Sequence, residues 1–476
     1  MQHAVRNAVL ILAGLPALAG AQGFGIFEHN TCAMGRAGTG AAAPCTDGSA
    51  IFFNPAGLAG LKGVRISGGV TLIKVTGSFT DDLFQDQTNL DNPLIPVPQV
   101  YASYGVTPKL GVGVGFFAPY GLQTRWPTSF DGRFIGYDNK ISTYYIQPTA
   151  AYQVTPWLKL GAGVDIVHGS VALHQRLDLS TTPVPLAGLP AGTTFGAFGV
   201  PLGTDFADAD LEASKTSYGA HFGFIAKVSK QLSIGAHYMM KVKLDYSGTA
   251  TFAQIATGIV TPANITIPGT PPVVIPANTN IDQLLAAPTA LGGLGVFSSG
   301  GLLSPQTASA SIANPDMLVL GLAFKAREDL TLLADYQWTH WSSFDVLMLQ
   351  FTPTTILNHT VYENYVNTSG VRVGAEWAAS NDLTVRGGYI YNTGAAPDQT
   401  VTPLLPEGAR NEITGGLSFK LGPMVTGAVA YQYIHQDDRR GRTRDAPPGV
   451  MPTTALNNGL YTFTGNLFGA SLAVAF

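Results

Sequence analysis

The sequence predicts an all-β protein, an about 14-stranded antiparallel transmembrane β-barrel. Only 12% of the 476 residues are charged and 56 are Gly. Average soluble domains carry about 25% charged residues, so much of this surface is expected to face a membrane rather than water. Beyond the N-terminus no apolar run reaches the length of about 18 residues that a spanning helix needs. Segments that alternate apolar and polar residues recur instead, separated by turn residues.

Residues 1–21 are expected to be a cleaved signal peptide. The apolar run Ala8–Ala19 follows the cationic Arg6 and ends at Ala19-Gly20-Ala21, the small-residue pattern of a signal-peptidase site. The run is too short to cross a bilayer, which argues against the alternative of a retained helical anchor. We therefore expect export to an oxidising compartment. The formal net charge of −4 gives no indication of a nucleic-acid partner.

The stretch SAIFFNPAGLAGLKG, residues 49–63, departs from the alternation that follows it. An aromatic pair runs into Asn54-Pro55 and then into small residues, which favour tight turns over ladder hydrogen bonds. Two cysteines, Cys32 and Cys45, lie upstream of this stretch. Two interpretations of this cysteine pair are possible: a disulfide that closes a short loop, or two buried free thiols. No cluster of Cys and His indicates a structural metal site.

From residue 64 to the C-terminus, the segments carry apolar residues on one face and polar residues on the other. Every second residue from Leu232 to Leu244 is apolar, for example, while the alternate positions include His237 and Lys243. The repetition of this pattern favours an apolar exterior around a polar lumen over an ordinary solvated sheet. We expect strands to begin near Val64, Val97, Lys109, Ile141, Trp157, Leu211, Gln231, Gln306, Asp329, Val361, Asn381, Arg410, Met424 and Leu460.

Short turns alternate with longer loops along the whole barrel region, as in bacterial barrels with short periplasmic turns and long extracellular loops. The two longest loops, near residues 179–210 and 252–305, are rich in Pro, Gly, Ala, Leu and Val rather than in charge. Two interpretations are open. The loops cover a site for an apolar ligand, or they pack on each other as a lid.

The C-terminal segment ends with apolar and aromatic residues on one face, from Phe468 to Phe476. An aromatic at the end of the last strand fits the interfacial girdle of barrels and predicts contact with outer-membrane lipid. A terminal aromatic is also the usual feature that the barrel assembly machinery recognises. We therefore expect that machinery to be a partner through Phe476.

The N-terminal stretch GFGIFEHNTCAMGRAGTGAAAPCTDGSAIFFNPAGLAGLKG resembles the hatch of the FadL family, outer-membrane transporters of long-chain fatty acids and hydrocarbons (OmpP1/FadL/TodX type). Further matches are FFAPYGL, YYIQPTAAY, DYQWTHWSSFD, and TVRGGYIYNTGAAPD followed by LLPEGARNEITGGLSF. The resemblance covers essentially the mature chain. It implies a hatch at residues 22–63 inside a barrel of residues 64–476. The matching hatch residues are Gly23, Phe24, Glu28, Gly35, Arg36, Ala37, Gly40 and the motif Asn54, Pro55, Ala56 with Gly57 and Leu58.

The resemblance also implies a route. An apolar ligand is captured between the two long external loops, passes to a lumenal pocket near the hatch N-terminus, and leaves sideways where the third strand is kinked. In that strand, LGVGVGFFAPYG, the lumenal face carries Gly111, Gly113 and Gly115. These glycines fit a kink, or a simple need for space beside the hatch. Cys32 and Cys45 depart from the family pattern, and a bridge between them would stiffen the hatch.

An anionic ligand needs a cation in the lumen, and Arg suits a planar carboxylate. Strand parity places Arg372, Arg386, Arg410 and the aromatic Phe117 on the lumenal face. With Phe24 they are the candidate substrate-binding residues, the cations for a carboxylate and the aromatics for its tail. The alternative is a structural ion-pair network, because several carboxylates also point inward.

The sequence thus favours passive uptake of long-chain fatty acids or similar hydrophobic molecules across a bacterial outer membrane, with no cofactor and no metal. Uptake of monoaromatic or other neutral hydrocarbons by the same kind of channel is the alternative. A general porin is less favoured, because such porins lack a hatch. An enzyme is not indicated, since His221 and His237 are lumenal but no GxSxG or HExxH motif accompanies them.

Overall fold

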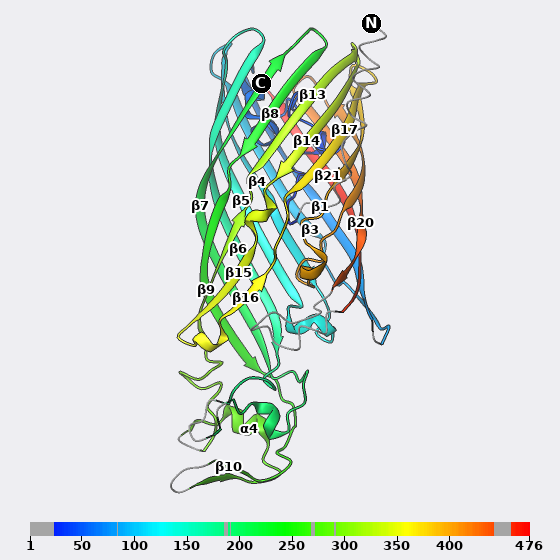
Figure 1. Ribbon diagram of the computed structural model, residues 1–476. Coiled ribbons are helices and arrows are strands. Elements are labelled where there is room, and N and C mark those ends of the chain that lie inside the picture. The colour runs from blue at the N-terminus through cyan, green and yellow to red at the C-terminus, as the bar shows by residue number, and fades with distance from the viewer. Residues whose placement is uncertain are drawn as a thin grey trace.

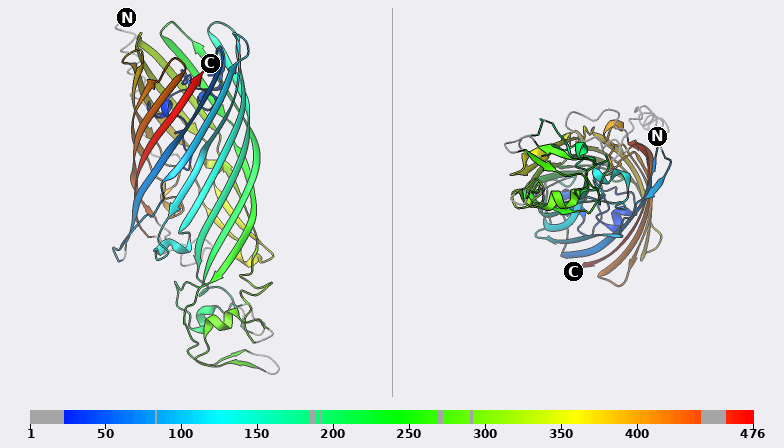
Figure 2. Two further views of the ribbon diagram at one scale, coloured as in Figure 1. Left: turned by 180° about the vertical axis from the view of Figure 1, so that it is seen from behind. Right: turned by 90° about the horizontal axis from the view of Figure 1, so that it is seen from below.

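The computed structural model describes residues 23–82, 84–184, 189–190, 192–267, 272–289, 292–441 and 458–476. The predicted signal peptide lies outside the described residues. Within those ranges the strands form a closed antiparallel barrel of fourteen strands, which Figures 1 and 2 show from the side and along the axis. The predicted fold class is confirmed. No helix in the same ranges is long and apolar enough to cross a membrane.

Some barrel strands are continuous, and others consist of two consecutive segments. The continuous strands are β1 (Val64–Asp81), β3 (Ile95–Gly105), β4 (Leu110–Arg125), β5 (Asp138–Gln153), β6 (Leu158–Leu177), β7 (Ala207–Lys227), β18 (Leu383–Asn392), β19 (Arg410–Lys420), β20 (Val425–Gly441) and β21 (Gly459–Ala475). The segmented strands are β8 with β9 (Leu232–Met239, Val242–Gln254), β12 with β13 (Gln306–Asn314, Met317–Arg327), β14 with β15 (Leu330–Thr339, Val346–Thr352) and β16 with β17 (His359–Tyr362, Thr368–Ala378). Three short strands lie in the connections, β2 (Gln87–Asn89), β10 (Ile265–Ile267) and β11 (Val273–Ile275).

The first and last strands close the barrel. β1 pairs with β21 from Arg65 opposite Ala475 to Asp81 opposite Gly459, and it pairs with β3 on its other side. The C-terminus and the short turns share one end, the upper end in Figure 1, while the long loops lie at the lower end. Because bacterial barrels have short periplasmic turns, the upper end in Figure 1 is the periplasmic end.

The exterior of the barrel is apolar and the lumen is polar, as the alternation predicts. On the exterior, Leu322 of β13 is 50% exposed, whereas Gln337 on the lumenal face of β14 is 2% exposed. An apolar exterior of this kind matches the hydrocarbon layer that a transmembrane barrel must face.

One stretch of the predicted alternation is wrong. β8 ends at Met239 and β9 begins at Val242, and this interruption shifts the alternation of the chain by one residue. Val242 and Leu244 therefore face the lumen and are buried. Lys243, predicted to be lumenal, lies on the outside with its side chain 63% exposed.

Residues 23–63 precede β1 and fold inside the barrel, where Figure 1 shows them in dark blue towards the periplasmic end. Asn30 begins the first helical turn by accepting a hydrogen bond from the Ala33 N–H. Asn54 caps the last turn, where Pro55 occupies a first position that needs no N–H donor. The elements of this segment, which we call the hatch, are α2 (Thr31–Met34), α3 (Ala50–Phe53) and the 3₁₀ helix η1 (Pro55–Leu58).

The two long loops, residues 178–206 and 255–305, meet beyond the extracellular end of the barrel, at the bottom of Figure 1. Phe195 and Phe198 of the first loop share an apolar cluster with Leu284 and Leu285 of α4 (Ile281–Ala286) in the second. The described parts of the loops therefore pack on each other, which is one of the two interpretations that their composition leaves open.

Candidate functional site

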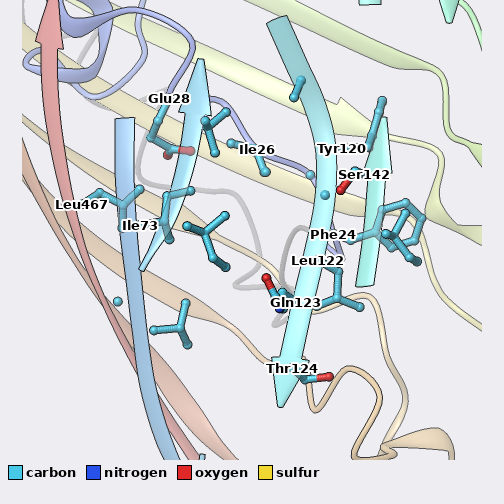
Figure 3. Close-up of a pocket in the computed structure, with 18 of the residues that line it drawn as sticks. Phe24, Ile26, Glu28, Ile73, Tyr120, Leu122, Gln123, Thr124, Ser142 and Leu467 are labelled. Atoms are coloured by element: carbon cyan, nitrogen blue, oxygen red, sulfur yellow. The ribbon is translucent and has the colours of Figure 1, made fainter. Parts of the chain in front are cut away.

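A cavity of about 380 Å³ lies beside the N-terminal end of the hatch (Figure 3). Apolar side chains from β1, β3, β4, β20 and β21 form most of its walls. The charged groups among the described lining residues are one acid, Glu28, and two cations, Lys140 and Arg410. A mainly apolar cavity with a few polar groups is the common form of a site for a small amphipathic molecule.

The cavity lies where the barrel wall is unpaired between β3 and β4. These strands pair from Gly105 opposite Gly111 to Val100 opposite Phe116, and their pairing ends there. Residues 95–99 of β3 continue alongside β1 alone. β4 continues alongside β5 after an irregularity in register between Phe117 and Tyr120.

The extracellular end of this unpaired stretch is closed by a side chain. Asn92 donates from its Nδ2 to the Gln123 carbonyl at 2.7 Å, and its Oδ1 accepts from the Arg125 N–H at 2.7 Å. We call the unpaired wall between residues 95–99 and 117–123 the window. Proline residues stand on both of its edges, and Pro has no N–H with which to extend the ladder.

The first described residues of the hatch bind the β4 edge of the window from the lumenal side. The Ile26 N–H donates to the Pro119 carbonyl at 2.8 Å, and the Gly121 N–H donates to the Phe24 carbonyl at 2.9 Å. Gly25 forms a β-bridge with Tyr120 between these two bonds. The hatch N-terminus thus takes the place of β3 as the partner of β4 across the window.

Two charged groups hold the start of the hatch. The buried carboxylate of Glu407 accepts a hydrogen bond from the Gly23 N–H at 2.9 Å, and its other oxygen accepts from two further N–H groups of its own loop. Arg410, the first residue of β19, donates to the Gly23 carbonyl and to Gln436 Oε1, both at 3.4 Å. In the described part of the chain Arg410 forms no ion pair. It is therefore a lumenal cation with weak, neutral partners.

Of the predicted aromatic residues, Phe24 lines the cavity and Phe117 does not. Phe24 packs edge-on against Trp341, with ring centroids 4.7 Å apart, and against Tyr120 at 6.1 Å. Phe117 faces the lumen as predicted but is fully buried, stacked on Tyr101. The structure therefore places Phe24 at the cavity and Phe117 in the packing around the hatch.

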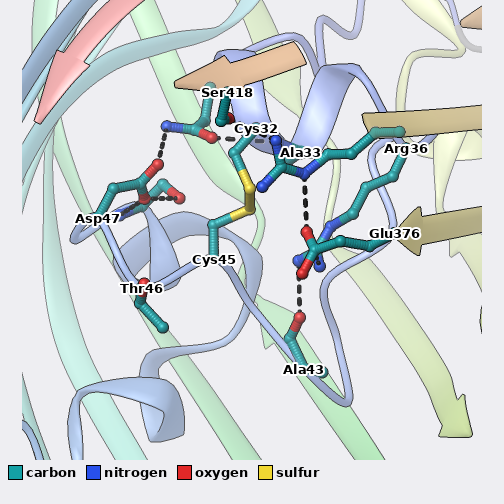
Figure 4. The surroundings of a disulfide bond; sticks show 12 residues. Cys32, Ala33, Arg36, Ala43, Cys45, Thr46, Asp47, Glu376 and Ser418 are labelled. Atoms are coloured by element: carbon teal, nitrogen blue, oxygen red, sulfur yellow. Dashed lines mark hydrogen bonds and ion pairs between the residues drawn. A yellow bond between two sulfur atoms is a disulfide. The ribbon is translucent and has the colours of Figure 1, made fainter. Parts of the chain in front are cut away.

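The structure separates the three predicted arginines. Arg410 lines the cavity, whereas Arg372 lies over the Phe27 ring of the hatch, 4.2 Å from its centroid. Arg386 is paired with Glu376 at 2.7 Å, and Glu376 also binds Arg36 of the hatch at 3.2 Å (Figure 4). Arg386 thus belongs to the ion-pair network that was the alternative interpretation, and Arg372 belongs to the packing of the hatch.

The three predicted glycines lie in the paired part of β4, before the window begins. A Cβ on Gly111 would come 2.0 Å from the Leu58 carbonyl of the hatch, and one on Gly113 would come 3.0 Å from Ile51. At Gly111 and Gly113 the hatch therefore approaches the wall closely, as the second interpretation of these residues states. The change in the course of β4 lies further on, at the irregularity between Phe117 and Tyr120.

The motif Asn54, Pro55 and Ala56 fastens the hatch to the wall formed by β7 and β8. The two N–H groups of Asn54 Nδ2 are shared among the carbonyls of Ala41 (2.5 Å), Phe224 (2.9 Å) and Ala236 (3.1 Å). Its Oδ1 accepts from the Ala56 N–H at 3.1 Å. The side chain is fully buried, so each of its polar atoms has exchanged water for a protein partner.

Cys32 and Cys45 form a disulfide that links α2 to the segment before α3 (Figure 4). The bond borders a second cavity of about 300 Å³, which is lined by the hatch, by Arg65 of β1 and by residues from β17 to β21. Asp47 beside the bridge accepts from Asn30 Nδ2 at 2.8 Å and from Ser49. The bridge therefore joins two parts of the hatch that are also connected by hydrogen bonds.

Several residues at the cavity were not singled out from the sequence. Tyr120 lies within the match FFAPYGL and Glu407 within LLPEGARNEITGGLSF, so both were inside quoted motifs without a role. Lys140 lies in no motif, and only its place on the strand after the kinked one could have indicated it.

A closed barrel with an apolar exterior, a hatch in its lumen and a cavity beside the hatch defines an outer-membrane transport protein, which is not an enzyme. The chain belongs to the family described as outer membrane protein transport protein (OMPP1/FadL/TodX), whose model matches residues 12–476. A 47 kDa outer membrane protein of Pasteurella multocida is 25% identical over 98% of this chain and 97% of its own. A long-chain fatty acid transport protein of Escherichia coli is 20% identical over 87% and 86%.

Solved structures share the fold. A FadL homologue of Pseudomonas aeruginosa superposes with a TM-score of 0.76 at 22% identity, covering 96% of this chain and 100% of that one. The toluene transporter TodX of Pseudomonas putida superposes with a TM-score of 0.63 at 17% identity, covering 96% and 99%. The same fold therefore occurs in proteins whose names point to different ligands.

Proposed function

We propose that the protein takes up long-chain fatty acids or similar amphipathic acids passively across the outer membrane. The observation that carries the proposal is the cavity that joins Arg410, in the lumen, to the window in the wall. Arg410 is held only by two long hydrogen bonds to neutral oxygens. A carboxylate offers it a stronger, charge-assisted pair, while the apolar walls receive the tail.

The proposed route has three stages. The packed external loops capture the ligand, the cavity beside Phe24 receives it, and it leaves sideways through the window into the membrane. At the last stage the hatch residues that bind the β4 edge must move aside. Because the exit faces the hydrocarbon layer, an apolar tail need not cross the aqueous periplasm.

Uptake of a neutral hydrocarbon is the second candidate, and the apolar walls of the cavity favour it. The two candidates differ in what they require of Arg410. A neutral ligand gains nothing from a cation, whereas a carboxylate left in an apolar cavity without its partner loses several kcal/mol.

The test is binding of oleate and of toluene to the purified protein in detergent, for the wild type, Arg410→Ala and Arg410→Lys. We expect Arg410→Ala to weaken oleate binding roughly tenfold to hundredfold, since a hydrogen bond to a charged group contributes about 1.5–3 kcal/mol. Arg410→Lys should recover part of the loss, and toluene affinity should change little. Arg386→Ala is the control, because this lumenal arginine is paired with Glu376 and does not line the cavity.

Oleate binding that is indifferent to Arg410→Ala would remove the carboxylate from the proposal. Tight toluene binding with no oleate binding would assign the protein to the hydrocarbon candidate. If Arg386→Ala weakened oleate binding as much as Arg410→Ala, the effect would come from the hatch and not from a head-group contact.

A further inference from the structure

The outer surface of β5 beside the window carries a lysine in an unusual place. Along β5, Thr143 and Tyr145 are buried on the lumenal side, whereas Lys140, Tyr144 and Ile146 are exposed. Side chains in a strand point alternately to its two faces, so Lys140 points away from the lumen. Lys140 nevertheless lines the same cavity as the lumenal Arg410.

The cavity therefore extends from the lumen to the outer surface through the window, along the edge of β4 that β3 leaves unpaired. Its lining includes Tyr120 of β4, whose side chain is buried on the lumenal face. It also includes Gln123 of β4, which is paired directly with Lys140 of β5. Directly paired residues lie on the same face of a sheet, so Gln123 and Lys140 share the outer face. Figure 3 shows Gln123 and Ser142 on the two neighbouring strands at this rim.

The position of Lys140 along the strand places it at the membrane interface. The outward residues of β5 run from Tyr152 near the periplasmic turn through Ile146 to Tyr144, and all three are exposed. Aromatic residues mark the two interfaces of a barrel, and the polar Ser142 and Lys140 follow Tyr144 on the extracellular side. Four residues of strand, about 13 Å, separate Lys140 from Tyr144. Lys140 is therefore expected at the level of the lipid head groups.

We propose that Lys140, with Gln123 and Ser142 beside it, is a second head-group subsite that receives the carboxylate of the transported acid as it leaves through the window. The inference rests on the proposed function and deepens it. An amphipathic acid that moves sideways must keep its carboxylate with a polar partner, because an unpaired charge in an apolar passage is costly. Arg410 supplies that partner at the lumenal end of the cavity and Lys140 supplies it at the outer end.

The surroundings of Lys140 fit this role. Within the described ranges its ammonium group has no ion-pair or hydrogen-bond partner. The nearby Arg125 is engaged with Asp91 at 3.4 Å and is not among the residues that line the cavity. On the periplasmic side of the subsite, the exposed Tyr144 and the exposed edge residues Pro96 and Pro98 offer an apolar path for the tail towards the hydrocarbon layer.

The same ammonium group could serve the phosphate of an outer-leaflet lipid instead, since both ligands are anionic head groups. The test separates these sources. Uptake of radiolabelled oleate and of methyl oleate, which has the same tail without the charge, is measured in cells that lack their own fatty-acid transporter. The cells express wild type, Lys140→Ala, Lys140→Arg or the control Lys243→Ala, an exposed lysine outside the cavity. Each variant is also assayed in cells whose lipid A has been enzymatically dephosphorylated.

We expect Lys140→Ala to slow oleate uptake about twofold to fivefold, the range of an exposed ion pair. Uptake of methyl oleate should stay unchanged, and Lys140→Arg should resemble wild type. The slowing should persist on dephosphorylated lipid A. Wild-type rates in Lys140→Ala, an equal loss for methyl oleate, or a loss that disappears without lipid phosphates would each overturn the inference.

Failure of the inference is distinguishable from failure of the proposed function. If wild type carries oleate and Arg410→Ala weakens its binding while Lys140→Ala is normal, only the outer subsite is wrong. If wild type carries no oleate and Arg410→Ala has no effect on binding, the proposed function fails and the subsite fails with it.

Discussion

The hydrogen bonds of Asn54 should decide how firmly the hatch is held in the barrel. The two N–H groups of its Nδ2 are shared among the carbonyls of Ala41, Phe224 and Ala236, and its Oδ1 accepts from Ala56, so the side chain contributes about three full hydrogen bonds. At about 1 kcal/mol net each, Asn54→Ala should destabilise the seated hatch by about 3 kcal/mol. This corresponds to a rise of roughly 100-fold in the population of the opened hatch.

Hydrogen–deuterium exchange of the purified protein measures this population. Amides of residues 50–58 should exchange roughly 100-fold faster in Asn54→Ala, while those of β18 keep their protection. Asn54→Asp should be at least as damaging, because a carboxylate would face the three carbonyls that now accept from Nδ2. Asn411→Ala is the control, since this asparagine accepts a hydrogen bond from Tyr389 on the outer wall. Unchanged exchange in Asn54→Ala would refute the reasoning.

Two further predictions concern the hatch. Replacing both cysteines by serine removes a bridge that spans 13 positions and should destabilise the hatch by about 3 kcal/mol. Amides of residues 33–44 should then exchange faster, while the melting temperature of the barrel stays unchanged. Exchange as slow as in wild type would contradict this prediction. Burial lowers the pKa of His29, whose ring bonds the Ile26 carbonyl at 2.7 Å, to about 3. Above pH 6.5 the ring is neutral in both the folded and the unfolded hatch. Between pH 6.5 and about 3 only the unfolded hatch binds the proton. Lowering the pH through this range therefore decreases the stability of the hatch by up to about 1.4 kcal/mol per pH unit. Exchange of residues 26–31, corrected for its intrinsic pH dependence, should rise from pH 7 to pH 5 in wild type and less in His29→Gln; equal rises would contradict this.

The strands could be predicted from the sequence because a barrel strand exposes one face to lipid and the other to a polar lumen. That pattern has period two in every strand, whichever strand lies beside it, so each strand can be recognised from its own residues. The predicted strand starts at Gln306 and Arg410, for example, agree with the structure. The same reasoning cannot detect a break in a strand when the alternation of apolar and polar residues continues unchanged in the sequence across the break. Between Met239 and Val242 the chain shifts by one position, and the apolar residues that follow pack on the lumen instead of the lipid.

The candidate site could be predicted only in part. Parity correctly turns Arg372, Arg386 and Arg410 inward, but parity does not say which lumenal residue the hatch covers. That depends on contacts more than 300 residues apart, such as Arg36 with Glu376. Likewise, the glycines of β4 fit either a kink in the strand or close approach of the hatch, and the sequence does not distinguish the two. In the structure the close approach of the hatch explains Gly111 and Gly113. The window is defined by where pairing ends, and pairing is a property of two strands together.

The contacts of the hatch also favour the window over the periplasm as the exit. A passage straight through the lumen requires the hatch to leave its seat. That step breaks the Asn54 hydrogen bonds to wall carbonyls, the two N–H bonds from the hatch to the Asp335 carboxylate, and the ion pair of Arg36 with Glu376.

A passage through the window requires only the first residues of the hatch to move. Residues 23–26 are held by the bonds to β4, by the Glu407 carboxylate and by one 3.4 Å bond from Arg410. A ligand carboxylate that binds Arg410 removes the last of these itself. In a passive transporter the energy for opening must come from tighter binding of the ligand to the open state than to the closed state. Opening the window breaks fewer bonds than unseating the hatch, and one of the broken bonds is replaced by a contact with the ligand. Ligand binding can therefore drive opening of the window more easily than release of the hatch.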